Sequence, residues 1–324
     1  MDTSDVGEHA GLSICETELG SRVDARHCST MTTYDAESRP CGLCKNIGLV
    51  RESHIIPAFA VRWLKDTSAT GHLRHLQSPD RRVQDGPKTP LLCDACEQRF
   101  ARHERTFANE IFHPFNADSS IIRRYDEWLL KFCTSVSWRI LSMYWGHAGG
   151  ESVPDLVAAR DRWNAYLTSR APHPGRFRQH ILPLLPIGAT NLNLPKNINR
   201  YLLRALDGEL VKNDDGVAMT FAKVGRFAIF GQVSGATSAW GGLTVKRTGV
   251  LAANPSGPPP WLFDFLCDRA RETQEARDSM SETQKDKIEI AFASNGERAK
   301  QSQSVEAMIY DARLFGRSAV VRRK

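Results

Sequence analysis

The sequence predicts an α+β fold in which a small metal-binding module precedes a larger body of helices and strands. Two Cys-x-x-Cys pairs, Cys41 with Cys44 and Cys93 with Cys96, lie in the first third of the chain. Apolar residues then recur at helical spacing over 119–147 and 154–170, and short β-rich runs follow from residue 180 onward. Helices and strands that occur in separate runs, rather than in strict alternation, are typical of α+β proteins.

The bulk properties are those of an ordinary globular protein. The chain has 324 residues, enough to bury a full hydrophobic core, and 41% of them are hydrophobic and 25% charged. It contains no apolar run of about 18 residues, so we expect no membrane partner. Its acidic first residues are unlike a signal peptide. We therefore expect a cytoplasmic protein, in which thiols serve as metal ligands rather than as disulfides.

Residues 1–38 have neither helical nor strand periodicity, and we predict that they are disordered. They carry eight acidic and two basic residues, a net charge of −6, and because the whole chain carries +6 the remainder carries +12. Such a basic body favours a polyanionic partner, although solubility explains the charge equally well. The start codon is left open between Met1 and Met31.

The two cysteine pairs predict one structural zinc ion. Four thiolates at this paired spacing satisfy tetrahedral zinc coordination. The pairs are further apart than the usual separation of about 15–20 residues, so we expect an insertion between them, a long polar loop over 67–90. A redox-active pair is the weaker alternative, because neither pair follows a strand in a βαβ pattern. The expected ligands are Cys41, Cys44, Cys93 and Cys96.

Residues 117–324 are predicted to form an α+β body whose role the sequence does not indicate. The amphipathic helices at its start are followed by segments of different character. We predict strands over 180–187, 217–223, 226–234 and 240–245, a helix over 197–206, a hairpin turn at 214–216, and charged helices near 261–278, 281–293 and 302–314.

Residues 39–116 resemble the zinc-containing members of the HNH endonuclease family, the ββα-metal nucleases. The string Ser-His-Ile-Ile-Pro at 53–57 follows the first cysteine pair, and Leu-Leu-Cys-Asp-Ala-Cys-Glu-Gln-Arg-Phe at 91–100 contains the second. The match is closer to one subgroup, uncharacterised bacterial proteins that share these strings and a later Trp-Arg helix, here Trp138 and Arg139. The resemblance implies a zinc-clamped ββα-metal module in front of the mixed body.

The resemblance also implies a metal-dependent endonuclease acting on DNA, with RNA as an alternative substrate. His54 matches the family's general base, and Glu97 holds the position of the helical ligand for a catalytic Mg or Mn ion. Ser53 stands where many members carry an acidic ligand, and the family's middle asparagine has no clear counterpart. The simpler interpretations are a structural His54 and a Glu97 that only favours the helix start.

Basic residues of the 67–90 segment are candidate phosphate contacts, because flexible cationic side chains bind nucleic-acid backbones. An exposed, solvated loop explains them equally well. The alternative function is a catalytically inactive zinc-clamped module that binds nucleic acid or another protein, and the identity of any protein partner is left open. The candidate nucleic-acid-binding residues are Arg74, Arg81, Arg82 and Lys88.

Overall fold

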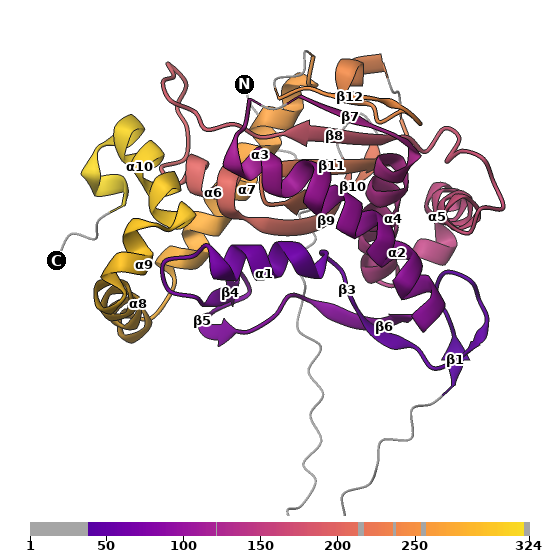
Figure 1. Ribbon diagram of the computed structural model, residues 1–324, viewed down its shortest axis with the longest axis horizontal. Coiled ribbons are helices and arrows are strands. Elements are labelled where there is room, and N and C mark those ends of the chain that lie inside the picture. The colour runs from indigo at the N-terminus through magenta and orange to yellow at the C-terminus, as the bar shows by residue number, and fades with distance from the viewer. Residues whose placement is uncertain (1–37, 121, 213–216, 236–237, 254–256, 321–324) are drawn as a thin grey trace, which may run out of the picture. The chain divides into compact units, whose positions relative to one another are not determined.

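A computed structural model describes residues 38–120, 122–212, 217–235, 238–253 and 257–320. They belong to one compact unit, Glu37–Lys324, in which helices combine with antiparallel sheets (Figure 1). This confirms the α+β class. Residues 1–37, most of the segment predicted to be disordered, lie outside the described residues. The turn predicted at 214–216 lies outside them as well. The division of the body from the module at residue 117 stays a prediction.

The first third of the described chain consists of short antiparallel strand pairs and helices. Strand β1 pairs with β2, β3 with β6, and β4 with β5. The long loop predicted over 67–90 is wrong in part, because it contains the β4–β5 hairpin and the start of β6. These strands lack the apolar alternation that reveals a strand in sequence. The elements are β1 (Arg39–Pro40), β2 (Ile47–Gly48), β3 (Arg51–His54), α1 (Ala58–Asp66), β4 (Leu73–His75), β5 (Ser78–Val83), β6 (Lys88–Leu92) and α2 (Asp94–Phe107).

Helix α2 does not stop at Phe107. It continues through a π-helical turn, Ala108–Phe112, into α3 (His113–Ala117). A π turn adds a residue to the helical repeat and shifts the phase of the residues after it. As a result Phe107, Phe112 and Phe115 are all buried, at 0%, 0% and 3% exposure. The π-helical turn therefore allows one continuous helix to bury three phenylalanines in the core.

The body is organised around a four-stranded antiparallel sheet in the order β8–β11–β10–β9. The β10–β11 turn requires a glycine, because Gly225 has φ +59° and a Cβ there would lie 3.0 Å from Phe112 and 3.1 Å from Trp63. The elements up to the sheet's end are β7 (Arg123–Tyr125), α4 (Glu127–Tyr144), α5 (Pro154–Leu167), β8 (Gln179–Pro183), α6 (Ile198–Arg204), β9 (Leu206–Lys212), β10 (Ala218–Val224) and β11 (Phe227–Gln232).

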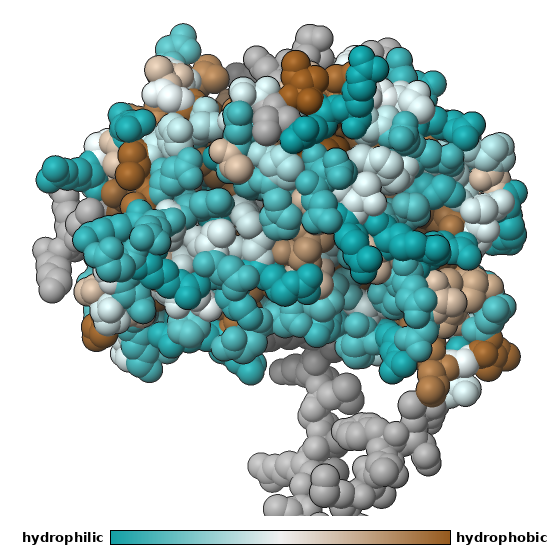
Figure 2. Space-filling model, viewed as in Figure 1, coloured by the Kyte–Doolittle hydropathy of each residue, from teal (hydrophilic) through white to brown (hydrophobic). Residues whose placement is uncertain are grey.

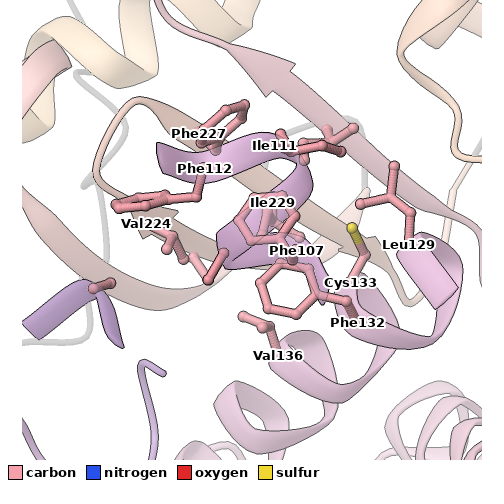
Figure 3. Packing of buried hydrophobic residues seen from close by; sticks show 14 of the residues in the cluster. Phe107, Ile111, Phe112, Leu129, Phe132, Cys133, Val136, Val224, Phe227 and Ile229 are labelled. Atoms are coloured by element: carbon pink, nitrogen blue, oxygen red, sulfur yellow. The ribbon is translucent and has the colours of Figure 1, made fainter. Parts of the chain in front are cut away.

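The main core lies between one face of this sheet and helices α2, α3 and α4. Figure 3 shows Phe107 of α2 against Phe132 of α4, and the two rings stack at a centroid distance of 4.0 Å. Ile229 of β11 and Val224 of β10 belong to the same cluster. Alternate residues of these strands point the other way, toward a second core against α6 and α7 (Pro260–Asp278). The sheet is thus covered on both faces.

The structure corrects the sequence interpretation of the body in three places. The helix predicted over 119–147 begins only at Glu127, because residues 123–125 form β7. Strand β9 has no clear sequence signal, because its residues are only half-buried and include Asp207 and Gly208. The strand predicted over 240–245 is wrong. That segment is a 3-10 turn, Ser238–Leu243, with a sharp bend at Gly241, although Thr244 does form a bridge to His180. Two adjacent glycines favour such a turn over a strand.

Helices at the carboxyl end of the described chain surround one edge of the module's hairpin. Figure 1 shows α8 and α9 beside β4 and β5, and hydrogen bonds join Arg74 to Gln284 and Ser281 to Asp80. The face in Figure 2 is predominantly hydrophilic. In the described residues, no helix is both long and apolar enough to cross a bilayer. The elements are β12 (Gly249–Leu251), α7 (Pro260–Asp278), α8 (Glu282–Ser294), α9 (Gly296–Lys300) and α10 (Gln303–Phe315).

His180 of β8 makes the stability of the sheet sensitive to pH. Its side chain is fully buried, stacks on Trp240 at 4.2 Å, and has Nδ1 3.0 Å from the Thr244 hydroxyl. Burial lowers the pKa of His180 to about 3. The unfolded chain takes up this proton near pH 6.5. The stabilisation from the neutral ring is therefore complete above pH 6.5 and is lost as the pH falls toward 3.

We expect the free energy of unfolding to fall by roughly 3 kcal/mol through His180 between pH 7 and pH 4. Urea unfolding across this range should show that the free energy of unfolding of His180→Asn depends less steeply on pH than that of the wild type. The difference in slope should correspond to nearly one bound proton. The same substitution at His147, which is exposed, serves as the control and should leave the slope unchanged. A His180→Asn slope equal to that of the wild type would contradict the prediction.

Candidate metal centre

The first cysteine pair lies in a tight turn between β1 and β2. The amide of Cys41 donates to the carbonyl of Asn46 at 2.9 Å, and the amide of Lys45 donates to the carbonyl of Cys41 at 3.0 Å. Lys45 closes the turn in the left-handed region, at φ +67°. The amide of Gly42 donates to the carbonyl of Leu91 at 2.8 Å. This bond holds the turn against β6, the strand that leads into the second pair.

The second pair begins helix α2, with Cys93 at its N-cap and Cys96 in its first turn. The amide of Cys93 donates to Cys41 Sγ at 3.4 Å, and the sulfurs of Cys44 and Cys93 are 3.8 Å apart. The ligand atoms of all four cysteines lie within 4.8 Å of one another. The four predicted ligands therefore converge into a cluster that could hold a metal ion such as zinc.

The chemistry of the cluster fits a thiophilic divalent cation. Burial raises the pKa of Cys41, but the amides of Cys93, Cys44 and Leu43 stabilise its thiolate and bring the pKa down to about 7. Burial and the nearby charge of Cys41 raise the pKa of Cys96. Several thiolates this close repel one another, and a bound cation removes that repulsion. Sulfur ligands select zinc over magnesium or calcium.

The cysteine cluster is packed directly onto the helices of the body. Cys41 and Cys96 share a buried hydrophobic cluster with Phe100 of α2 and with Trp138 of α4. Phe100 and Trp138 meet edge to face at 5.9 Å. The cysteine cluster is thus packed into one hydrophobic core together with side chains of α4 and α5.

A buried ion pair crosses the same contact. Arg139 of α4 is 2% exposed at its side chain and pairs with Glu104 of α2, which is 18% exposed. The Arg139 guanidinium also lies over the Phe100 ring, 5.0 Å from its centroid. Glu104 is therefore occupied by a structural partner. The Trp-Arg string of the sequence supplies one apolar and one charged contact to α2.

His54, the predicted general base, ends strand β3 and pairs with a carboxylate that the sequence does not indicate. Its Nε2 lies 2.8 Å from Asp85 Oδ1, and Lys88 Nζ lies 2.5 Å from Asp85 Oδ2. Burial acts to raise the pKa of Asp85, but hydrogen bonds from Lys88, His54 and the Gly86 amide outweigh it and hold that pKa well below its usual range. Asp85 is thus an anion that orients the imidazole.

The position of Asp85 results from strand pairing. Strands β3 and β6 are antiparallel, with His54 opposite Lys88 and Ser53 opposite Thr89. The turn that enters β6 contains Asp85 and Gly86, and a Cβ on Gly86 would come within 2.8 Å of Val61 in α1. The turn is therefore held close to α1 beside the end of β3. The only sequence signal is an Asp-Gly-Pro turn, which does not reveal its partner.

Ser53 and His54 are neighbours on a strand, so their side chains point to opposite faces. Ser53 is 1% exposed. Its hydroxyl accepts from the Leu92 amide at 3.2 Å and donates to the Arg51 carbonyl at 3.3 Å. The Leu92 contact thus joins Ser53 of β3 to β6, and the Ser53 side chain points away from the imidazole of His54.

Glu97 lies in the first turn of α2 and is half-buried. Its Oε1 is shielded from solvent and has no hydrogen-bond partner among the described residues. The neighbouring acid Asp94 instead forms a two-pronged pair with Arg51, at 2.7 and 2.8 Å. Of the two acids that open α2, Glu97 is therefore the one with a carboxylate oxygen that makes no hydrogen bond.

The candidate phosphate contacts occupy different environments. Arg81 and Arg82 are exposed on β5, and Lys88 is engaged with Asp85. Arg74 is half-buried and donates to the Pro79 carbonyl at 2.6 Å and to Gln284 Oε1 at 3.1 Å. The structure does not gather these four residues into one cluster with His54.

Within the described residues, the four cysteines are the only group of three or more His, Cys, Asp or Glu side chains close enough to hold a metal ion. Comparison with protein-family models, with curated proteins and with solved structures finds no match in any of the three. The functional argument therefore rests on the chemistry of the residues themselves.

Proposed function

We propose that the protein is a metal-dependent endonuclease of the HNH type, acting on DNA, with one structural zinc ion on Cys41, Cys44, Cys93 and Cys96. The observation that carries the proposal is the contact of His54 with Asp85 at 2.8 Å. A carboxylate that holds one ring nitrogen of a histidine leaves the other nitrogen to take a proton, the arrangement of general-base catalysis. Free thiolate ligands also suit a reducing compartment, and we propose a cytoplasmic location.

His54 is suited to activating water at a phosphodiester. Its side chain is 22% exposed, so a substrate can approach while the ring stays partly enclosed. With Nε2 held by Asp85, Nδ1 is the nitrogen that accepts the proton of the attacking water. Lys88 is 36% exposed and contributes positive charge next to the pair, where the developing charge of the phosphate needs stabilisation.

Glu97 fits the role of ligand to a catalytic Mg or Mn ion. A carboxylate oxygen without a hydrogen-bond partner is a suitable donor for a hard cation. Magnesium is commonly held by one or two carboxylates together with substrate phosphates, and Glu97 would be the protein ligand in such a site. When bound, the ion would stabilise charge on the scissile phosphate and its leaving oxygen.

The second candidate function is a catalytically inactive zinc-clamped module that binds nucleic acid or a protein. It is favoured by the placement of Ser53, whose hydroxyl is used by the backbone where related nucleases carry an acidic ligand. In this alternative His54 and Asp85 only close the turn before β6.

A plasmid-nicking assay with Mg or Mn tests the proposal. We expect His54→Ala to lower the cleavage rate by about 10²–10⁴-fold, the usual contribution of a general base. Asp85→Asn should lower it less, and the double variant should be no slower than His54→Ala, because Asp85 acts through His54. Zinc content should stay the same in all three.

The control is His147→Ala, which removes an exposed imidazole from another part of the fold. It should cleave like the wild type. Cleavage that survives unchanged in His54→Ala would assign the activity to another site or a contaminant. DNA binding without any cleavage in the wild type would favour the inactive module.

A further inference from the structure

A cavity of about 310 Å³ opens between the β4–β5 hairpin and helices α7 and α8. Both sides are tied together. Arg74 donates to Gln284 at 3.1 Å, and Asp80 accepts from the amide and hydroxyl of Ser281 at 2.9 and 3.0 Å. The cavity is therefore formed by two segments that are fixed to each other, and its size is within the usual range for small-ligand sites, about 300–1,000 Å³.

The lining of this cavity is strongly cationic. No Asp or Glu lies among the described residues that form it. Burial, and after it the charge of Arg82, lowers the pKa values of both His72 and Arg74. The cationic and imidazole side chains are His72, Arg74, His75, Arg82 and Arg277.

Two of these arginines have donors left for a ligand. Arg82 is exposed and uses only Nη1, which donates to His72 Nε2 at 3.2 Å. Arg277 is exposed, and its guanidinium makes no hydrogen bond or ion pair with any described residue. Burial and the charge of Arg200 lower the pKa of Arg277, although Asp278 and Asp311 act to raise it. Planar guanidinium groups bind phosphate through paired hydrogen bonds.

The rest of the wall is apolar. Leu76, Met280 and Ile288 face the same space. A ligand that fills this cavity therefore needs an anionic end and an apolar body. We propose that the cavity binds a nucleoside monophosphate, with the phosphate at Arg82 and Arg277 and the base against the apolar wall. The ligand is either a free nucleotide or the end unit of a nucleic-acid strand. This site is independent of the proposed nuclease chemistry at His54.

Calorimetric titration of the full chain with dAMP, deoxyadenosine and inorganic phosphate tests the site. We expect dAMP to bind at least about tenfold more tightly than either part alone. Arg277→Gln and Arg82→Gln should each weaken dAMP binding by about tenfold or more, the effect of losing one charge-assisted hydrogen bond. Competition by an oligo-dA strand indicates a strand end, and absence of competition indicates a free nucleotide.

The chain supplies a matched control for each arginine. Arg81 neighbours Arg82 on β5 but does not line the cavity, and Arg271 lies on α7 paired with Asp268. Arg81→Gln and Arg271→Gln should bind dAMP like the wild type, and so should His54→Ala, which separates this site from the nuclease centre. The proposal is overturned if dAMP does not bind, if the control variants weaken it equally, or if His54→Ala alone abolishes it.

Discussion

Replacing Cys93 with Ser should remove zinc from the protein and strongly destabilise it. Purified wild type should hold about one zinc ion per chain, as four converging thiolates imply. A ligand present at a thousandfold excess over its Kd stabilises the folded state by about 4 kcal/mol. Loss of the ion should lower the free energy of unfolding by at least that order, and the change is measured by urea unfolding with metal analysis.

Cys267→Ala is the matched control. Cys267 is a buried free cysteine in the second core, far from the cluster in sequence. Its truncation should cost some stability while zinc content stays near one ion per chain. A strong chelator should reproduce the effect of Cys93→Ser in the wild type and in Cys267→Ala. Normal stability of Cys93→Ser without zinc would show that the cluster is not a structural metal site.

Arg139→Met should destabilise the protein by about 3–5 kcal/mol, because it leaves the Glu104 carboxylate without its partner in a mostly buried site. The double variant Arg139→Met, Glu104→Gln should recover much of this loss, since removing both charges avoids a buried unpaired ion. Urea unfolding of the four proteins in this double-mutant cycle gives the coupling energy directly.

Arg102→Met, on the same helix α2 but exposed, is the control and should change stability by less than about 0.5 kcal/mol. A cost below about 1 kcal/mol for Arg139→Met would mean that water reaches Glu104 and replaces the arginine. In that case α2 and α4 would be held together by Phe100 and Trp138 alone.

The parts of the structure that sequence could predict are those with a local signal. The spacing of the cysteines identified the four-sulfur cluster, since each pair needs only a tight turn to present its ligands. Regular apolar spacing identified α4 and α5, although α4 begins at Glu127 rather than near 119. The range predicted for the second of these helices, 154–170, begins at the first residue of α5 and extends three residues beyond its last, Leu167.

The parts that escaped prediction depend on long-range pairing. Asp85 lies in a polar segment, and only the register of β3 against β6 brings it to His54. The same holds for Glu104, whose partner Arg139 lies 35 residues further along the chain. Sequence periodicity describes which face of an element is apolar, but it does not say which charged residue will lie opposite.

The contact between the β4–β5 hairpin and the last helices has a consequence for synthesis of the protein. The hydrogen-bond partners of Arg74 and Asp80 lie 210 and 201 residues later in the chain. At about 5–20 residues per second, a ribosome needs roughly 10–40 s to deliver them. All four cysteines have emerged long before that. The four cysteines can therefore come together on the nascent chain before the β4–β5 hairpin, which lies between the two pairs in sequence, makes its contacts with α8.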